Sequence, residues 1–310
     1  MKKRISIAMT LFFMTLSFCA LAQGRCYGLY KGENVGAKEI DKVRALYGSS
    51  PCLVLSFYDS TWLPSSEYLL SLREEGVVPV VTIEPWTAAT GVSFTPNDDY
   101  ISKLAEALNE YNAEVYIRYA HEMNGNWYPW GGDPKRYVAS YISFHDALSS
   151  LLRNNNVKWI WSVNNESVPD TAKNNVLLYY PGDKYVDAVG IDGYLREPSW
   201  IKRAYLSARE IFLRRGTFSY LFGSTITELK KIDKPILITE TAIASNDDFK
   251  GAAIKSFFKD LENDYPYISN FIWFDVNKEA DWRVVSGVIG LAYFKNGIKD
   301  WQAYDKTRTH

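Results

Sequence analysis

Residues 115–163 read VYIRY from Val115, DPKRYVASYISFHDALSSLLRN from Asp133 and VKWIWSV from Val157. The first and third runs are short, rich in β-branched and aromatic residues, and apolar on both faces, which is typical of strands buried in a parallel sheet. The stretch between them is long enough for several helical turns. These residues therefore predict one strand–helix–strand unit.

The same alternation continues in both directions along the chain. Stretches with helical spacing include SSEYLLSLREEG, NDDYISKLAEALNEY and DDFKGAAIKSFFKDLEND, and a longer helical region over residues 200–231 is interrupted around Gly216 and Gly223. Eight strands alternating with helices over residues 23–310 predict an α/β fold, a single (β/α)8 TIM barrel. The eight apolar runs begin near Tyr27, Leu53, Val78, Val115, Val157, Val186, Pro235 and Phe271.

A doubly wound open sheet is the alternative. Such folds usually carry a Gly-rich phosphate loop after the first strand, but the segment after Tyr30, KGENVGAKEI, has neither G-x-G-x-x-G nor a P-loop lysine pattern. The sequence therefore gives no support for a nucleotide-binding function, and we expect no cofactor. Because no solenoid repeat, linker or charge block marks a boundary, we expect one domain over residues 23–310.

The N-terminus has the three parts of a signal peptide. Lys2, Lys3 and Arg4 precede an apolar stretch over residues 5–18, and small residues follow at Ala20 and Ala22. This order predicts a signal peptide over residues 1–22 that is cleaved after Ala22. The apolar run is too short to span a membrane. We therefore expect an exported protein, periplasmic or extracellular, with no membrane attachment after cleavage.

Charge and histidine content exclude several classes of function. Basic residues (35) nearly balance acidic ones (36), and the formal net charge is −1. No excess positive field is available to hold nucleic acid or an anionic membrane. With His310 in the tail, only His121 and His145 remain in the body, too few for a His-rich metal site. We expect no metal, no nucleic-acid partner and a monomer.

Two cysteines remain after the predicted cleavage, Cys26 and Cys52. Both stand at the start of strand candidates, and neighbouring parallel strands could bring them together. In an oxidising compartment a single disulfide is one possibility, and two small buried thiols are the other.

Carboxylates stand at two predicted strand ends, where the active site of a (β/α)8 barrel lies. The fourth strand leads into AHEMNGNWYPWGG from Ala120, which contains Glu122, and the seventh ends in TET, which contains Glu240. These two side chains would face each other across the barrel mouth. Retaining glycoside hydrolysis needs two carboxyl groups roughly 5 to 5.5 Å apart, one to protonate the leaving oxygen and one to attack the anomeric carbon. A zinc site of the type H-E-x-x-H is excluded, because Gly125 stands where the second histidine would be.

Aromatic residues gather at the same strand ends. Sugar rings present apolar C–H faces that pack on flat aromatic surfaces, so this distribution favours a sugar over other neutral substrates. Of Trp159 and Trp161 on the fifth strand, at least one is expected to be structural, and Trp62 is given no role. The aromatic residues predicted to bind substrate are Trp86, Trp127, Trp130, Trp161, Tyr194, Trp273 and Trp282.

Four blocks of the sequence resemble glycoside hydrolase family 26. They are RYAHEMNGNWYPWGG from Arg118, YYPGDKYVDAVGIDGY from Tyr179, LITET from Leu237 and IWFDVNKEADWRV from Ile272. They span most of the chain and each falls at a predicted strand end. The resemblance implies a (β/α)8 barrel that retains anomeric configuration, with Glu122 as the acid/base and Glu240 as the nucleophile.

The resemblance also implies roles for the neighbouring side chains. By the mechanism, Glu122 should be kept protonated by burial and by the charge of Glu240, while hydrogen-bond donors keep Glu240 ionised. His121 is implied to support the acid/base and the sugar, and Tyr194 to hold the nucleophile. Trp127 is implied to stack on the sugar, and Trp273 to form a platform on the eighth strand. Arg118 matches an arginine that lies under the site.

The substrate that the resemblance ranks first is β-1,4-mannan, the commonest of the family, cleaved by endo action. The run Asn126-Trp127-Tyr128-Pro129-Trp130 departs from the usual mannanase form and also resembles mixed-linkage β-glucanase members. Mannose and glucose differ at the 2-hydroxyl, so the choice depends on one or two hydrogen bonds. An exported polysaccharide-binding protein that has lost catalysis is an alternative of another class, and the presence of both glutamates argues against it.

Overall fold

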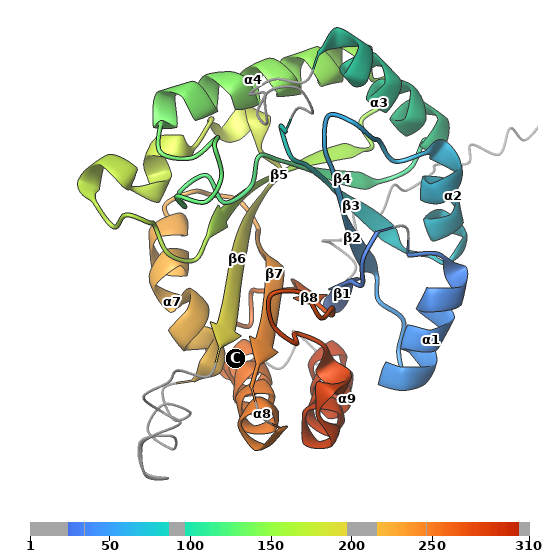
Figure 1. Cartoon of the computed structure of the whole chain (residues 1–310), viewed down its shortest axis with the longest axis vertical. Coiled ribbons are helices and arrows are strands. Elements are labelled where there is room, and N and C mark those ends of the chain that lie inside the picture. Colours follow the sequence, from blue (N-terminus) through green and yellow to red (C-terminus); the bar gives the residue numbers. More distant parts are fainter. Residues whose placement is uncertain (1–23, 34, 87–96, 197–215, 246, 304–310) are drawn as a thin grey trace, which may run out of the picture.

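The computed structural model describes residues 24–33, 35–86, 97–196, 216–245 and 247–303. Eight parallel strands close into a barrel in chain order, and helices lie around its outside (Figure 1). The predicted (β/α)8 barrel is confirmed. The strands are β1 Cys26–Tyr30, β2 Leu53–Tyr58, β3 Val78–Ile83, β4 Val115–Tyr119, β5 Val157–Asn164, β6 Ala188–Arg196, β7 Ile236–Ala244 and β8 Asn270–Phe274. The helices are α1 Ala37–Tyr47, α2 Ser66–Glu74, α3 Asp98–Tyr111, α4 Pro134–Leu151, α7 Thr217–Leu229, α8 Asp247–Asn263 and α9 Val288–Gln302.

All eight strands begin within two residues of the predicted positions, whereas β6 and β7 extend further than the apolar runs that predicted them. One helical detail is wrong: α7 runs through Gly223 without a break. A Cβ atom at Gly223 would lie 2.9 Å from the Tyr265 hydroxyl oxygen, so this glycine permits close packing and marks no turn. Gly216 stands at the N-cap of α7 with a φ of 84°. Residues 200–215 lie outside the described ranges.

Capping residues fix where several helices begin. The side chains of Ser65, Asn97 and Asp133 accept hydrogen bonds from backbone N–H groups in the first turns of α2, α3 and α4. Each cap of this kind contributes about 1 kcal/mol. The cap at Asp133 also sets the end of the long loop after β4, which carries Glu122.

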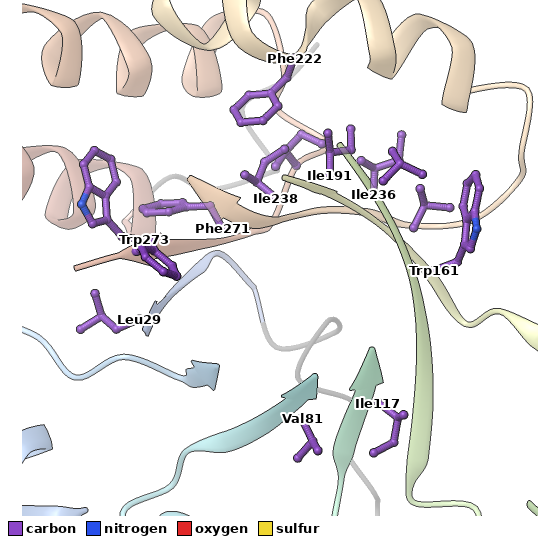
Figure 2. Close-up of a cluster of buried hydrophobic side chains, with 14 of the residues drawn as sticks. Leu29, Val81, Ile117, Trp161, Ile191, Phe222, Ile236, Ile238, Phe271 and Trp273 are labelled. Atoms are coloured by element: carbon purple, nitrogen blue, oxygen red, sulfur yellow. The ribbon is translucent and has the colours of Figure 1, made fainter. Parts of the chain in front are cut away.

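The main hydrophobic core lies between the outer faces of the strands and the helices. Ile117, Ile191 and Phe271 point outward from their strands into this layer, and Phe222 of α7 packs onto it (Figure 2). All four side chains are fully buried. Full burial of one such side chain stabilises the fold by about 1.5–3 kcal/mol, so this shell supplies the rigidity that holds the strand ends in place.

The inside of the barrel changes from apolar to polar along the strands. A second cluster, contributed by the earlier parts of the strands, contains Leu53, Leu55, Val80, Tyr116, Ile160, Ala188, Leu237 and Ile272. Side chains two residues apart on a strand share a face. The next inward positions on four strands are Thr82, Arg118, Ser162 and Thr239, all buried. The apolar plug therefore supports a polar layer just below the C-terminal strand ends.

The predicted signal peptide, residues 1–22, lies outside the described residues. Within the described ranges, no helix has both the length and the apolar character needed to cross a bilayer.

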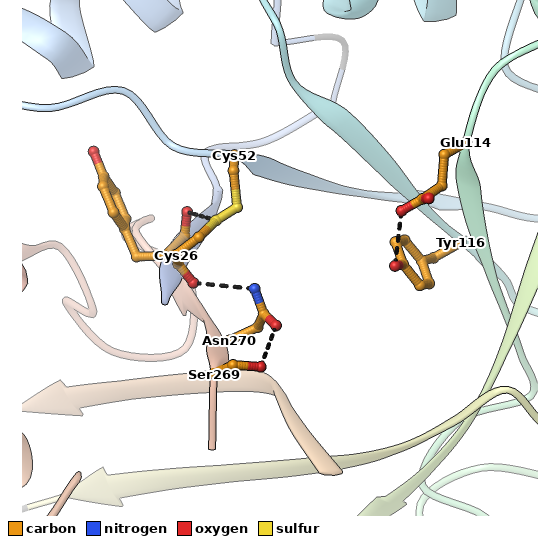
Figure 3. The surroundings of a disulfide bond; sticks show 7 residues. Cys26, Cys52, Glu114, Tyr116, Ser269 and Asn270 are labelled. Atoms are coloured by element: carbon orange, nitrogen blue, oxygen red, sulfur yellow. Dashed lines mark hydrogen bonds between the residues drawn. A yellow bond between two sulfur atoms is a disulfide. The ribbon is translucent and has the colours of Figure 1, made fainter. Parts of the chain in front are cut away.

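Cys26 and Cys52 form a disulfide, which decides between the two possibilities left open by the sequence. Cys26 begins β1, Cys52 directly precedes β2, and their Cα atoms are 6.1 Å apart (Figure 3). This separation lies within the usual range for a disulfide. The bond ties the first strand, which closes the barrel against β8, to the second.

Loss of this bond is expected to destabilise the protein by about 3 kcal/mol, because the disulfide closes a loop of 26 residues in the unfolded chain. Urea unfolding of a chain starting at residue 23 measures this as the difference between the wild type and a Cys26→Ser, Cys52→Ser variant. A reducing agent should lower the wild-type midpoint and leave the variant unchanged. Equal midpoints for the two proteins would contradict the expectation.

Candidate active site

The backbone after β4 turns sharply and directs Glu122 toward the barrel axis. Ala120 and Glu122 have φ values of 49° and 54°, in the left-handed region that residues with a Cβ atom seldom adopt. The Glu122 N–H donates to the Ser162 carbonyl of β5 at 3.0 Å, which holds the turn against the barrel. Strained backbone of this kind concentrates at functional sites.

The Glu122 carboxyl is 8% exposed and accepts two hydrogen bonds. Asn164 Nδ2 donates to Oε1 at 2.9 Å, and Trp127 Nε1 donates to Oε2 at 2.6 Å. Burial, followed by the nearby charge of Glu240, raises the pKa of Glu122 to about 7, although the two hydrogen bonds oppose this change. Glu122 is therefore a buried acid that is protonated in mildly acidic solution and loses its proton near neutral pH.

Glu240 lies in β7 in the opposite kind of environment. Its carboxylate is 5% exposed and accepts hydrogen bonds from the Arg118 guanidinium and from the Tyr194 hydroxyl. These two donors orient the carboxylate and place positive charge beside it. Two carboxyl groups with contrasting surroundings thus stand on β7 and after β4, an arrangement that can divide the acid and nucleophile roles between them.

Arg118 is fully buried behind the cavity wall. Its guanidinium pairs with Asp192 at 2.9 Å as well as with Glu240, and its Nε donates to the Thr82 hydroxyl at 2.8 Å. Ligand atoms of His121, Asp192 and Glu240 lie within 4.8 Å of one another, a spacing that could hold a metal ion. The guanidinium already supplies a cation to both carboxylates of this group.

His121 is buried beside Glu240. Its Nε2 lies 3.2 Å from the Tyr128 hydroxyl and 3.9 Å from Glu240 Oε1. Burial, with a smaller contribution from Arg118, lowers the pKa of His121 well below its usual value. The imidazole is therefore neutral at physiological pH and acts as a hydrogen-bonding group rather than a charge.

These side chains line a cavity of about 930 Å³ at the C-terminal ends of the strands. Each of the eight strands, or the residue or loop directly after it, contributes to the lining. Of the predicted site residues, the cavity brings together Glu122, Glu240, His121, Trp127, Tyr194 and Trp282. It does not include Arg118, Trp86, Trp130, Trp161 or Trp273.

Trp161 and Trp273 lie in the outer core, which corrects their predicted role in substrate binding (Figure 2). Both are fully buried. Trp161 packs against Tyr180, with ring centroids 5.1 Å apart, and Trp273 packs against Phe294 at 5.1 Å. Because side chains alternate along a strand, the residue that faces the cavity from the end of β8 is the next one, Phe274. Trp159 also points into the outer core.

Trp86 and Trp130 support the site from behind, which corrects their prediction as sugar platforms. Trp130 is fully buried, donates from Nε1 to the His121 carbonyl at 2.7 Å, and stacks on Tyr128 at 4.3 Å. Trp86 packs edge-on against Trp130 at 5.3 Å. These contacts fix the loop after β4 and, through it, the positions of His121 and Tyr128.

Several lining residues were missed by the sequence analysis. Trp62 in the loop after β2 is 36% exposed, and it resembles in this respect the predicted Trp127, which is 43% exposed. Most of the other missed residues stand directly at a strand end, and this position could have identified them as lining residues. The missed lining residues are Tyr30, Glu33, Phe57, Tyr58, Asp59, Trp62, Glu84, Tyr128, Asn164, Arg196, Phe274, Lys278 and Glu279.

Comparison with known proteins agrees with this geometry. Endoglucanase H of Acetivibrio thermocellus is 29% identical over 316 aligned positions, which cover 96% of this chain and 34% of that protein. A mannan endo-1,4-beta-mannosidase of Bacillus subtilis is 26% identical over 215 positions, which cover 55% of this chain and 58% of that protein. The chain thus spans about a third of the first relative's length and less than two thirds of the second's.

Solved structures share the fold. A modular endo-beta-1,4-mannanase from Cellulomonas fimi superposes with a TM-score of 0.62 at 17% identity, covering 91% of this chain and 71% of that one. A Bacillus subtilis mannanase gives 0.59 at 20% identity, covering 86% and 83%. The sequence profile of Glycosyl hydrolase family 26 matches residues 89–244, half of the chain, and this range includes Glu122 and Glu240. The chain therefore belongs to glycosyl hydrolase family 26.

Proposed function

We propose that this protein is a retaining, endo-acting glycoside hydrolase of a β-linked polysaccharide, with Glu122 as acid/base and Glu240 as nucleophile. The observation that carries the proposal is the contrast between the two carboxyl groups. Glu122 is held protonated by burial, whereas Glu240 is paired with Arg118 and Tyr194. The same cavity contains both.

The proposed reaction has two displacements. Glu240 attacks the anomeric carbon, the bond to the leaving oxygen breaks, and Glu122 gives that oxygen its proton. A water molecule then enters, Glu122 removes its proton, and the resulting hydroxide displaces Glu240 from the anomeric carbon. Tyr194 and Arg118 orient the attacking carboxylate, while Asn164 and Trp127 orient the acid.

We expect kcat/KM to fall on the alkaline side with an apparent pKa near 7. Glu122 must be protonated to serve as the acid, and the fraction of protonated enzyme is lost as pH rises through its pKa of about 7. Rates at low substrate concentration across pH 4–10 measure this limb. The hydrogen bond from Trp127 lowers the pKa of Glu122, so Trp127→Phe should move the limb to higher pH. A limb at the ordinary pKa of glutamate, or one that Trp127→Phe leaves in place, would argue against Glu122 as the acid.

The first substrate that we propose is β-1,4-mannan. Several relatives are named mannan endo-1,4-beta-mannosidase, from Bacillus subtilis and Caldalkalibacillus mannanilyticus among others. A polymer of neutral hexoses also suits a cavity that has exposed indoles on two separate loops, at Trp62 and Trp127. Platforms on separate loops support binding of a chain on both sides of the cleaved bond.

Mixed-linkage β-glucan is the second candidate. A glucan substrate is favoured by the match to endoglucanase H, which covers 96% of this chain, compared with 55% for the Bacillus subtilis mannosidase. The Trp-Tyr-Pro-Trp run after Glu122 supports the same choice.

Product release from a panel of purified polymers tests the proposal. The panel contains β-mannan, glucomannan, mixed-linkage β-glucan, cellulose and β-1,3-xylan, and the last is included because two relatives are named β-1,3-xylanases. Wild type is compared with Glu240→Gln. Activity on mannan or glucan that the variant lacks supports the corresponding substrate. No hydrolysis of any polymer, with binding retained, would favour a non-catalytic polysaccharide-binding protein.

We also propose that the protein is exported and acts as a monomer in the periplasm or outside the cell. The signal-peptide pattern of residues 1–22 supports export, and a disulfide between Cys26 and Cys52 suits an oxidising compartment. Cell fractionation with N-terminal sequencing of the mature chain tests export, and sedimentation tests the oligomeric state.

A further inference from the structure

Glu84 occupies a rigid position at the C-terminal end of β3, inside the cavity. Its backbone N–H donates to the Tyr58 carbonyl at 2.8 Å, and its own carbonyl accepts from Trp86 N–H at 2.8 Å. Two residues earlier on the same face of β3, Thr82 accepts the hydrogen bond from Arg118 inside the barrel. The Glu84 side chain therefore points inward, above the Arg118 layer, and lines the cavity.

Glu84 differs from the other carboxylates of the cavity because no described residue donates a hydrogen bond to it. Each of the others has donors or an ion-pair partner: Tyr30 and Phe57 N–H for Glu33, Thr61 for Asp59, Asn164 and Trp127 for Glu122, Arg118 and Tyr194 for Glu240, and Lys278 for Glu279. A half-buried carboxyl that receives no hydrogen bond from the described residues relies on water or a ligand for its donors.

Glu84 is electrostatically similar to Glu122, and its place in the barrel is what separates it from the two proposed catalytic glutamates. Burial first, and then the charge of Glu240, raises the pKa of Glu84 to about 7, while Arg118 and Lys278 oppose the rise and Asp59 adds to it. β3 and β7 lie on opposite sides of the closed barrel, so a sugar positioned over Glu240 would have Glu84 on its far side. The proposed double displacement uses Glu122 and Glu240 and leaves Glu84 available for binding.

We propose that Glu84 binds the substrate by hydrogen bonding to two neighbouring hydroxyl groups of a sugar ring, and that it thereby determines which hydroxyl configuration the cavity accepts. This proposal rests on the function proposed above. A neutral hexose offers pairs of adjacent hydroxyls, and the two oxygens of a carboxyl group can bind such a pair, both as acceptors when the group is ionised, or one as donor and one as acceptor when it is protonated. A sugar with one of these hydroxyls inverted or missing leaves an acceptor unpaired and binds less well.

Kinetics of Glu84→Ala and Glu84→Gln test the proposal, with Glu110→Gln on the exposed face of α3 as the matched control. On the polymer that the wild type degrades fastest, Glu84→Ala should lower kcat/KM about 10- to 100-fold, mainly through KM. A series of oligosaccharides that each lack one hydroxyl sharpens the test. Loss of the recognised hydroxyls should lower kcat/KM for the wild type and leave Glu84→Ala nearly unaffected, whereas Glu110→Gln should behave as wild type.

Thermal unfolding separates binding from a structural role. Because Glu84 has no donor among the described residues, both substitutions should leave Tm unchanged or raise it, and a purely structural residue would lower it. Unchanged kcat/KM and the same response to every missing hydroxyl would overturn the proposal. If the wild type degrades no polymer, the proposed function fails separately, and calorimetric binding of mannan and glucan oligosaccharides then decides: weaker binding by Glu84→Ala supports the proposal and equal binding overturns it.

Discussion

Replacing Glu240 with glutamine is expected to lower kcat by roughly four to six orders of magnitude on every polymer that the wild type hydrolyses. The amide has no anionic oxygen to attack the anomeric carbon, so no glycosyl-enzyme forms. Glutamine nevertheless fits the position, because its carbonyl can accept from Arg118 and its amide group can donate to the Tyr194 hydroxyl. Initial rates from reducing-end assays, beside equal substrate binding, measure the loss.

The fold must be shown to survive the change, since Glu240 pairs with a fully buried guanidinium. Asp192 still pairs with Arg118 in the variant, so we expect the protein to fold with some loss of stability. A second variant, Glu240→Ala, leaves room for azide. Azide should attack the anomeric carbon directly and give a glycosyl azide of inverted configuration. Rates near wild type in Glu240→Gln, or an azide product of retained configuration, would remove Glu240 from the nucleophile's role.

The barrel could be predicted because each strand is a short apolar run whose two faces are both buried. Val115–Tyr119 packs one face on the helices and the other inside the barrel, so its sequence carries no long helical period. Each such run can be recognised as a buried strand by itself, and eight of them alternating with helices indicate a (β/α)8 barrel. The glycine at position 223 misled the helix prediction, because small size serves packing there rather than a turn.

The site could be predicted only in part, because position at a strand end does not tell which way a side chain points. Trp273 and Phe274 are neighbours at the end of β8, yet one lies in the outer core and the other lines the cavity. Trp159 and Trp161 are two residues apart and so share a face, and both point outward. The alternation shows that the two share a face, but the structure is needed to show that this face is the outer one.

Glu84 was overlooked for a related reason. In the run Ile83-Glu84-Pro85-Trp86, the sequence analysis assigned the tryptophan to the site. Trp86 supports the loop after β4, whereas Glu84, directly after β3, points into the cavity. The sequence could not show that no described residue donates to Glu84, because hydrogen-bond partners come from strands far apart in the chain. The same limit applies to Asn164, which meets Glu122 across 42 positions.

Replacing Glu122 with alanine is expected to separate the two steps of the proposed reaction. On polysaccharide, kcat should fall about 10²- to 10⁴-fold, because the leaving oxygen receives no proton. An aryl glycoside with an acidic phenol releases a weakly basic phenolate, so the first step needs no proton from Glu122. A rapid burst of phenolate should then precede slow turnover. Alanine is the better test here than glutamine, since Asn164 and Trp127 both donate to the carboxyl and an amide can accept from only one of them.

Azide and pH then identify the role of Glu122 independently of the rate. In Glu122→Ala, azide should enter where the base-activated water would, displace Glu240 from the glycosyl-enzyme, and give a glycosyl azide of retained configuration, opposite to that expected for Glu240→Ala. The alkaline limb near pH 7 should also disappear on the activated substrate, because the acid whose ionisation sets that limb has been removed. Equal losses on polysaccharide and aryl glycoside, with no burst and no azide product, would mean that Glu122 holds the site together without transferring a proton.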